Sequence, residues 1–249
     1  KGSTWRPSKP ERMPAAKAQP RPASGIGLET VYAWSPSPSA QTLSLPEQIA
    51  ERIGNTIIRG GYEPGARIQE QEVADQFQVS RGPVREALRI LERDGLVQIH
   101  ARRGAQVTQL NVGEVNDLFE LRISLLWLAA RLAAERRDPD FMARMRASVE
   151  ILSKTAKSGD ADAYTSAVYR HNLLLAEGSG NHFLRNMVFS LAHQTLRYSR
   201  LGLSTPKRRA QSARNWRSLL AAVQGNEPKQ AQEAAEKLVR DSRDTAVKM

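Results

Sequence analysis

The chain has 249 residues, a formal net charge of +11 and no cysteine. Without cysteine there are no disulfide bonds and no thiolate metal ligands, which agrees with a reducing cytoplasm. The sequence has no run of about 18 apolar residues that could cross a membrane, and its start has no apolar segment of the kind found in signal peptides. We therefore expect a cytoplasmic protein without a membrane partner, and the positive charge favours a polyanion as partner.

Residues 1–40 differ in composition from the rest of the chain. They hold seven of the 13 prolines and six basic side chains against two acidic ones, without an apolar period. This composition predicts a disordered basic arm, which either contacts DNA phosphates or is a passive tail. Residues 41–110 carry nine basic and nine acidic side chains. Net charge therefore does not locate a nucleic-acid site in that segment, and only the placement of its arginines can do so.

Three helical patterns follow the arm. The first begins near Pro46, which suits the first turn of a helix, buries a row of isoleucines and ends at Gly60. The second covers about residues 70–77. The third begins after Ser80, a favourable N-cap residue, and ends at Gly95, where a glycine commonly terminates a helix.

Two short strand patterns come next. Residues 96–99 and residues 105–108 alternate between apolar and polar side chains, and residues 102–104 form the tip of a hairpin between them. Three helices followed by a hairpin predict a winged helix-turn-helix domain over residues 41–110.

The chain after Asn111 is helical throughout. Breaks that contain glycine or proline divide residues 111–249 into about six helices of 15–24 residues with short connections. This pattern favours an antiparallel helical bundle. The expected fold is therefore mainly α, with an N-terminal winged helix-turn-helix and a C-terminal antiparallel bundle.

The first helix of the predicted bundle has apolar residues on more than one face. We expect Leu125, Leu128 and Leu132 to be buried, and Leu126 and Trp127 beside them to supply a dimer surface. A homodimer is expected because one winged helix contacts too few base pairs to find a single operator in a genome.

The start of the third helix carries the residues best suited to DNA. In helix-turn-helix proteins this helix enters the major groove N-terminus first. Ser80 and the free backbone amides can hold a phosphate, and Arg81 and Arg85 share one face, from which either can make a bidentate contact to guanine. Gly82 removes bulk where the helix approaches the groove. The alternative is that these arginines belong to an ordinary solvated face.

Residues 49–107 resemble the N-terminal domain of the GntR superfamily of bacterial regulators. The matching segments are Ile57-Ile58-Arg59-Gly60, Pro64-Gly65-Ala66-Arg67-Ile68, Glu70-Gln71-Glu72-Val73-Ala74, Val79-Ser80-Arg81-Gly82-Pro83-Val84-Arg85-Glu86-Ala87-Leu88, Leu91-Glu92, Asp94-Gly95-Leu96-Val97 and Arg103-Gly104-Ala105.

The resemblance implies which residues contact double-stranded operator DNA. They are Ser80, Arg81, Gly82, Pro83 and Arg85 of the helix and Arg102, Arg103 and Gly104 of the wing. Wing arginines of this kind suit the neighbouring minor groove. Gln71 stands where the family commonly has a phosphate-binding arginine, so it can donate a hydrogen bond but supplies no charge.

The C-terminal half is similar to the FCD branch (FadR-type C-terminal domain) of the same superfamily. The similarity rests on Leu118-Phe119-Glu120-Leu121-Arg122, Leu128-Ala129-Ala130-Arg131-Leu132-Ala133-Ala134, Ser179-Gly180-Asn181 and Arg197-Tyr198. It implies a bundle of six or seven helices that binds small organic acids, often over a divalent metal held by one carboxylate and three histidines.

The residues at the implied metal positions depart from that pattern. Alignment on Ser179-Gly180-Asn181 and on residues 219–223 places Val168, Asn172, Trp216 and Leu238 where the four ligands are expected. Valine and leucine cannot ligate a metal, and tryptophan offers only a donor. His182 and His193 lie 11 residues apart, about 16 Å along a helix, which is too far to share one ion. We therefore expect no metal and no other cofactor.

The resemblance also implies a residue for an effector. Arg122 corresponds to a family arginine that often holds an effector carboxylate, and the alternative is a salt bridge to an acidic neighbour. Further candidates for the effector pocket are His171, Asn172, Arg197, Tyr198 and Trp216.

The sequence thus favours a ligand-responsive transcriptional regulator, most simply a repressor, whose DNA affinity changes with a small organic ligand, such as a carboxylate, in the helical domain. A second hypothesis is an effector-independent regulator with a degenerate ligand site. An enzyme is disfavoured, because no Ser-His-Asp order, glycine-rich phosphate loop or pair of carboxylates is found.

Overall fold

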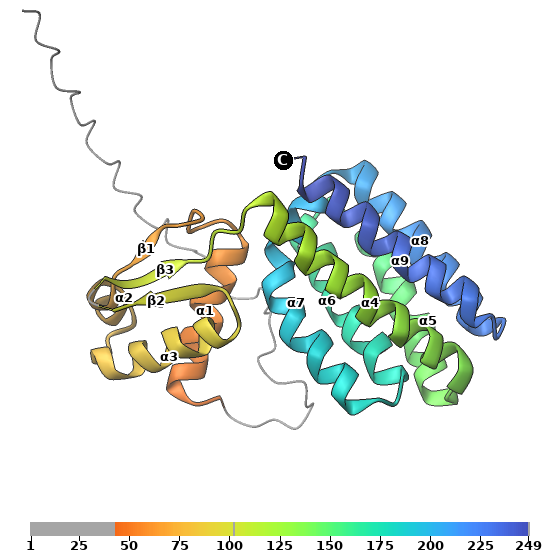
Figure 1. The fold of residues 1–249 in the computed structure, drawn as a ribbon, viewed down its shortest axis with the longest axis horizontal. Coiled ribbons are helices and arrows are strands. Elements are labelled where there is room, and N and C mark those ends of the chain that lie inside the picture. Colours follow the sequence, from red (N-terminus) through yellow and green to blue (C-terminus); the bar gives the residue numbers. More distant parts are fainter. Residues whose placement is uncertain (1–42, 102, 249) are drawn as a thin grey trace, which may run out of the picture.

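The computed structural model describes residues 43–101 and 103–248, and over these residues the chain forms nine helices and one three-stranded sheet (Figure 1). The elements fall into an N-terminal domain, which runs from α1 to β3, and a helical domain, which runs from α4 to α9. The mainly helical fold with a winged helix-turn-helix is confirmed. The predicted arm, residues 1–40, lies outside the described residues.

The N-terminal domain contains the predicted three helices and hairpin, with one additional strand. Its elements are α1 (Leu45–Ile58), β1 (Arg67–Ile68), α2 (Glu70–Phe77), α3 (Arg81–Arg93), β2 (Val97–His100) and β3 (Gly104–Val107). The sheet order is β1-β3-β2, and both pairs are antiparallel. Strand β1 was not predicted, because two residues are too few to show an alternating pattern.

Apolar side chains from all three helices form the core of this domain. Ile49, Ile57 and Leu88 are among its fully buried residues, since their spacing along α1 and α3 places them on inward faces. Helix α3 ends at Arg93 with Asp94 as its C-cap residue, and Gly95 adopts a φ of +72°, which a residue with a side chain rarely does. This turn directs the chain from α3 into β2.

The helical domain consists of six helices, as predicted, in an antiparallel bundle (Figure 1). They are α4 (Val112–Arg136), α5 (Pro139–Thr155), α6 (Ala161–Gly178), α7 (His182–Gly202), α8 (Pro206–Gln224) and α9 (Pro228–Ala246). Helix α4 packs against α6, α7, α8 and α9. None of the helices within the described ranges is long and apolar enough to pass through a membrane.

Helix α4 buries a different face from the one predicted. Leu126 is 2% exposed and belongs to the core, whereas Leu125, Leu128 and Leu132 are only half-buried beside it. Trp127 is 40% exposed. Because apolar residues occupy almost every position of this stretch, helical periodicity cannot select the face that packs inward.

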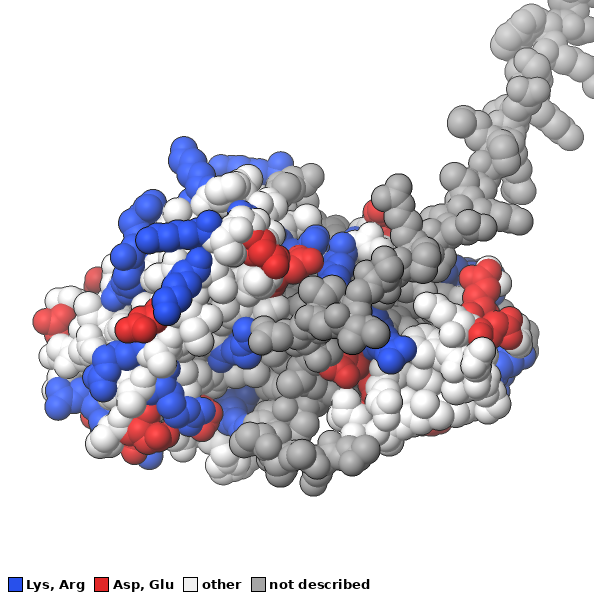
Figure 2. Space-filling model, turned by 180° about the vertical axis from the view of Figure 1, so that it is seen from behind, with Lys and Arg blue, Asp and Glu red and all other residues white. Residues whose placement is uncertain are grey.

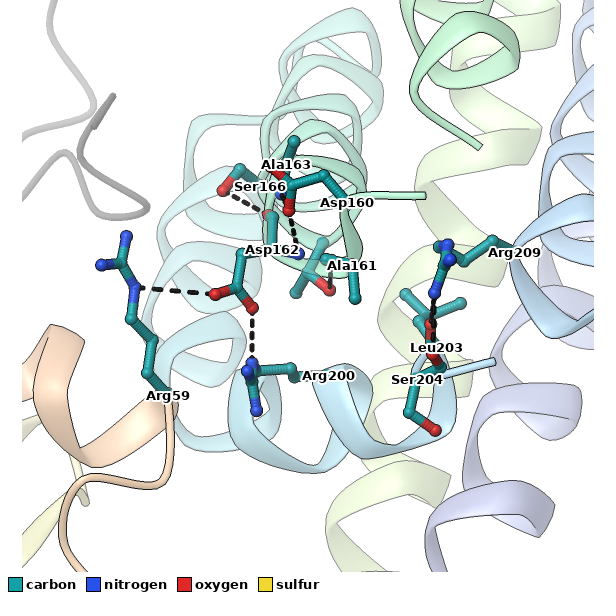
Figure 3. Close-up of polar contacts among 11 residues, drawn as sticks. Arg59, Asp160, Ala161, Asp162, Ala163, Ser166, Arg200, Leu203, Ser204 and Arg209 are labelled. Carbon is teal, nitrogen blue, oxygen red and sulfur yellow. Dashed lines mark hydrogen bonds and ion pairs between the residues drawn. The ribbon is translucent and has the colours of Figure 1, made fainter. Parts of the chain in front are cut away.

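A fully buried arginine closes the end of α7. Arg209 of α8 is 2% exposed, and its guanidinium donates hydrogen bonds to the carbonyl oxygens of Leu203 (3.2 Å), Ser204 (2.7 Å) and Gly159 (3.2 Å), two of which are drawn in Figure 3. Carbonyl groups at a helix C-terminus have no partner within the helix. Arg209 therefore fixes the α7–α8 turn and the α5–α6 turn to each other.

Candidate functional site

The N-terminal turn of α3 presents the predicted DNA-contacting residues on the surface. Ser80 is the N-cap residue, and its hydroxyl makes no capping hydrogen bond. The side chains of Arg81 and Arg85 are 53% and 55% exposed. A Cβ added to Gly82 would meet only Ser80 Oγ, at 3.9 Å, so packing within the protein does not require a glycine there. Pro83 lies in the same first turn.

One carboxylate holds both exposed arginines. Glu70, at the start of α2, accepts hydrogen bonds from Arg81 Nη2 (2.9 Å) and Arg85 Nε (2.8 Å) on the same oxygen, Oε2. Burial works to raise the pKa of Glu70, but the hydrogen bonds and charges of the two arginines outweigh it and hold the pKa below 4.5. The two guanidinium groups are thus oriented together before any DNA is bound.

The remaining candidates of this domain flank α3. Gln71 of α2 donates to Asp75 Oδ1 at 2.8 Å, so its side chain is held along its own helix. At the tip of the wing, Gly104 has a φ of +81° and Arg103 is exposed, whereas Arg102 lies outside the described residues.

The structure adds one basic residue that the sequence analysis did not select. Arg67 is exposed on β1, and a Cβ on Gly104 would lie 3.8 Å from its Nε and Nη2 atoms. Arg67 is therefore a further cation at the wing. The only indication in the sequence was its place beside the unpredicted strand β1.

Positive charge is not confined to the N-terminal domain. On the face opposite to that of Figure 1, Lys and Arg side chains gather over the helical domain (Figure 2). This agrees with the balanced charge of residues 41–110. The position of a few arginines, and not the total charge, distinguishes the N-terminal turn of α3.

A small internal cavity lies within the helical bundle. Val168, Asn172, Trp216 and Leu238, the four positions aligned with metal ligands, all line it together with Arg122. Other lining residues come from α7, α8 and α9 and include Ser199, Arg208 and Ser242. The free space is about 20 Å³, which is room for about one water molecule.

Arg122 is one of two arginines that line this cavity, and Arg208 is the other. Arg122 Nη1 donates to Ser199 Oγ at 2.6 Å, and the Arg122 guanidinium lies 5.8 Å from the centre of the Phe119 ring. Burial lowers the pKa of Arg122 to about 10, so it is still protonated at neutral pH. Among the described residues no carboxylate pairs with it, so the predicted alternative of a salt bridge to an acidic neighbour is not found there.

Two neutral side chains at the cavity also carry polar atoms without a partner. Asn172 donates to the Val168 carbonyl oxygen at 2.9 Å, which leaves its Oδ1 without a hydrogen bond. Trp216 Nε1 has no acceptor within the described chain. Buried polar groups of this kind are normally hydrogen-bonded, so the cavity offers donors and an acceptor to a polar ligand.

The donors at the cavity do not fit a divalent metal. Asn172 supplies one amide oxygen, whereas Val168, Trp216 and Leu238 supply no lone pair suited to ligation. Within residues 43–101 and 103–248 no group of three histidine, cysteine, aspartate or glutamate side chains is arranged to hold an ion. The polar chemistry of this cavity comes mainly from two arginines, Arg122 and Arg208, the amide of Asn172 and the indole N–H of Trp216.

Three of the predicted pocket residues lie elsewhere. His171 is fully buried behind Trp216, with the two rings in an edge-to-face contact at 4.5 Å, and its Nδ1 is 2.7 Å from Ser148 Oγ. Arg197 and Tyr198 line a separate cleft between the two domains. They are turned away because successive residues of α7 differ by about 100° in direction, and Ser199 is the residue that reaches the cavity.

Helices α6 and α7 also contact the N-terminal domain. Tyr169, which follows Val168, and Leu196 of α7 belong to the apolar core of that domain. His193 Nδ1 lies 3.7 Å from Asp94 Oδ2 at the end of α3, and His193 Nε2 is hydrogen-bonded to the Tyr169 hydroxyl at 3.2 Å. Burial raises the pKa of Asp94 to about 6 and lowers that of His193 to about 4. At neutral pH the contact therefore joins a carboxylate and a neutral imidazole.

An ion-pair network forms a second contact between the domains (Figure 3). Asp162 at the start of α6 lies 2.6 Å from Arg200 Nε of α7 and 3.9 Å from Arg59 Nε at the end of α1. These groups are about one-third exposed, so solvent weakens the attraction. The network therefore contributes little to the stability of the fold.

Residues 45–107 match the family model for bacterial regulatory proteins of the gntR family, and residues 117–241 match the model for the FCD domain. The chain belongs to the GntR family. It carries an FCD domain behind its winged helix-turn-helix, so the family predicted from the sequence is confirmed.

Curated relatives of the chain are transcriptional regulators. The HTH-type transcriptional regulator YdhC of Bacillus subtilis is 32% identical over 142 residues, which cover 57% of the chain and 63% of the relative. The Nta operon transcriptional regulator of Aminobacter aminovorans is 37% identical over 102 residues, 41% of the chain and 47% of the relative. The chain thus spans about half to two-thirds of the length of these curated relatives.

Solved structures share the fold over most of the chain. Escherichia coli McbR/YncC superposes with a TM-score of 0.68 at 22% identity, covering 80% of this chain and 94% of that one. A GntR regulator described as putative, from Rhodococcus sp. RHA1, gives a TM-score of 0.69 at 19% identity, with 83% and 99% covered. At these identities the likeness concerns the fold alone.

The neutral state of His171 makes stability depend on pH. Burial lowers the pKa of His171 to about 3, below the usual value of 6.5. As pH falls below 6.5 the unfolded chain binds a proton that the folded chain does not, and the free energy of unfolding falls by about 1.4 kcal/mol per pH unit for this group. Replacing His171 by Gln is expected to remove about 2 kcal/mol of the loss between pH 7 and pH 5.

Urea unfolding at several pH values measures this slope. His182→Gln, which removes an exposed histidine, serves as the control and should keep the wild-type slope. Equal slopes for the wild type and His171→Gln would show that His171 titrates normally in the folded protein.

Proposed function

We propose that the chain is a sequence-specific DNA-binding repressor of transcription that acts in the cytoplasm as a homodimer and has no enzymatic activity. The observation that carries the proposal is the N-terminal turn of α3, where Arg81 and Arg85 are exposed side by side and oriented by Glu70. This is the position from which a recognition helix contacts base edges.

The residues of this turn make different contacts with DNA in this proposal. Ser80 and the first backbone amides of α3 hold a phosphate, because these groups have no partner within the helix. Arg81 and Arg85 contact guanine in the major groove. Gly82 and Pro83 keep the approach free of bulky side chains. Arg102, Arg103 and Gly104, with Gln71 beside the phosphates, complete the set taken over from the family resemblance.

A small organic acid in the bundle cavity tunes the affinity for DNA in this proposal. Arg122 supplies the charge partner, and Asn172 and Trp216 supply the hydrogen-bonding groups that lack partners. Helices α6 and α7 line the cavity on one side and pack on the N-terminal domain on the other, where His193 of α7 lies beside Asp94. A ligand that spreads these helices therefore changes the orientation of α3.

The size of the cavity favours a second candidate. Space for about one water molecule and the loss of the metal ligands are also what an effector-independent regulator with a degenerate ligand site would show. Under the first proposal Trp216 must change its position to admit a ligand.

The dimer surface that we propose is formed by α4 and α7, which pack together (Figure 1). Large apolar side chains are exposed on both helices: Leu121 (45%) and Trp127 (40%) on α4, Phe183 (72%) and Met187 (52%) on α7. Exposed apolar residues on adjacent elements commonly mark an interface. A two-fold partner on this surface would place two α3 helices on a palindromic operator.

Loss of either recognition arginine should weaken specific binding. We expect Arg81→Ala or Arg85→Ala to lower the affinity for the operator by about 1–3 kcal/mol, because each guanidinium contributes a bidentate base contact. The operator is obtained by selection from random DNA duplexes, and affinity is measured by fluorescence anisotropy at fixed salt concentration. Arg217→Ala, an exposed arginine on α8, is the control, and operator affinity unchanged in both helix variants would contradict the assignment.

Binding in the bundle cavity should depend on Arg122. We expect at least one acid from a panel of mono- and dicarboxylic acids to raise the melting temperature of the wild type, and Arg122→Gln to abolish that rise because the carboxylate loses its charge partner. Arg217→Gln, which removes an exposed arginine of α8 outside the cavity, should retain it. If no acid raises the melting temperature, the effector-independent alternative is supported.

Charge placed on the proposed dimer surface should produce monomers. Trp127→Glu or Phe183→Glu is expected to shift the protein from dimer to monomer at micromolar concentration, because an unpaired carboxylate would be buried at the interface. Light scattering coupled to size-exclusion chromatography measures the mass. Ile151→Glu, at a residue of α5 that is 49% exposed, is the matched control, and a wild type that is itself monomeric with and without DNA refutes the proposal.

A further inference from the structure

A cleft between the end of α3 and α7 is lined by residues of both domains. It encloses about 290 Å³, far more than the bundle cavity. From the N-terminal domain Glu92, Leu96 and Val97 line it, and from α7 Gln194, Arg197 and Tyr198 do. A molecule bound there would therefore contact both domains at once.

The walls of this cleft are largely apolar, with one cation. Ile57, Leu96 and Leu110 supply aliphatic surface. Arg197 Nη1 and Thr108 Oγ1 are shielded from solvent and have no hydrogen-bond partner among the described residues. Such atoms are uncommon in folded proteins and carry a desolvation cost until a partner is supplied.

The charges around Arg197 leave its guanidinium incompletely paired. Burial lowers the pKa of Arg197, and Tyr198 and Glu63 only partly oppose this effect. Glu92, the carboxylate that lines the same cleft, accepts a hydrogen bond from the Ile99 backbone amide at 2.9 Å, so it is engaged within its own domain. The cleft thus presents one donor group suited to a carboxylate and a body of apolar surface.

We propose that this cleft is a second ligand site, distinct from the bundle cavity, that binds a small apolar molecule bearing a single carboxylate or sulfonate. The anion pairs with Arg197, and Thr108 offers a further polar contact. The apolar body lies against Ile57, Leu96 and Leu110. The single guanidinium and the nearby Glu92 disfavour polyphosphates, which require several cations.

The ligand would connect the recognition helix with the helical domain. Leu96 follows directly after Gly95, which ends α3, and a Cβ on Gly95 would lie 2.7 Å from the Gln194 side chain. Occupancy of the cleft therefore holds the end of α3 against α7. This site acts on the orientation of the domains whether or not the bundle cavity binds an effector.

A matched pair of fluorescent probes tests the site in the full chain. The first is 8-anilinonaphthalene-1-sulfonate, and the second is N-phenyl-1-naphthylamine, which has the same ring system without the sulfonate. We expect saturable binding of the sulfonate probe, weakened about tenfold or more in Arg197→Gln because a charge-assisted hydrogen bond is lost. The neutral probe should bind Arg197→Gln as it binds the wild type.

Three further variants make the outcome decisive. Arg146→Gln, at an exposed arginine of α5, and Arg122→Gln, in the bundle cavity, should bind the sulfonate probe normally. Gln194→Trp, which fills the cleft, should exclude both probes, and it tests the site even where Arg197→Gln melts early. No saturable binding, binding lost equally in Arg146→Gln or Arg122→Gln, or normal binding in Arg197→Gln or Gln194→Trp would overturn the proposal.

Discussion

The contact of α6 and α7 with the end of α3 is the interaction on which the rest of the molecule depends. Each of these two helices has one side in the bundle cavity and another on the N-terminal domain: Val168 is followed by Tyr169, and Ser199 lies six residues beyond His193, which turns it about 120° around the helix. A helix transmits a displacement along its length as a nearly rigid body. Anything that moves one side therefore moves the other.

The contact is made of groups that are poorly matched at neutral pH. A carboxylate whose pKa is raised to about 6 faces an imidazole whose pKa is lowered to about 4. At neutral pH the carboxylate is largely ionised and the imidazole is neutral, so the two groups form no ion pair, and Tyr169 and Leu196 join the domains by apolar packing. Such a contact joins the two domains but leaves their relative orientation able to change.

Sequence reasoning succeeded where a residue's role is local. Proline in a first turn, glycine after a last turn and a regular apolar period defined α1, α3 and the six bundle helices, because these features act within a few residues. The family alignment on Ser179-Gly180-Asn181 and on residues 219–223 also selected Val168, Asn172, Trp216 and Leu238, which line one cavity. That result came from the family resemblance and not from a local pattern.

Sequence reasoning failed where the burial or position of a side chain depends on which neighbouring element it packs against. Leu126 and Leu128 are equally apolar, and only the position of the other helices buries the first and leaves the second at the margin. Arg197 and Tyr198 belong to the same helix as Ser199 but face the other domain. Strand β1 exists because β3 is beside it, and its two residues carry no pattern of their own.

The single carboxylate of Glu70 has a consequence for how such a protein searches a genome. A DNA phosphate outside the operator can bind Arg81 or Arg85 only if that arginine gives up its hydrogen bond to the Glu70 carboxylate. A guanine edge that offers two acceptors in the correct plane compensates for that separation more completely. Under the proposed recognition by Arg81 and Arg85, Glu70 lowers the affinity for nonspecific sites more than the affinity for the operator, and the ratio of these two affinities determines how long the protein stays at the operator.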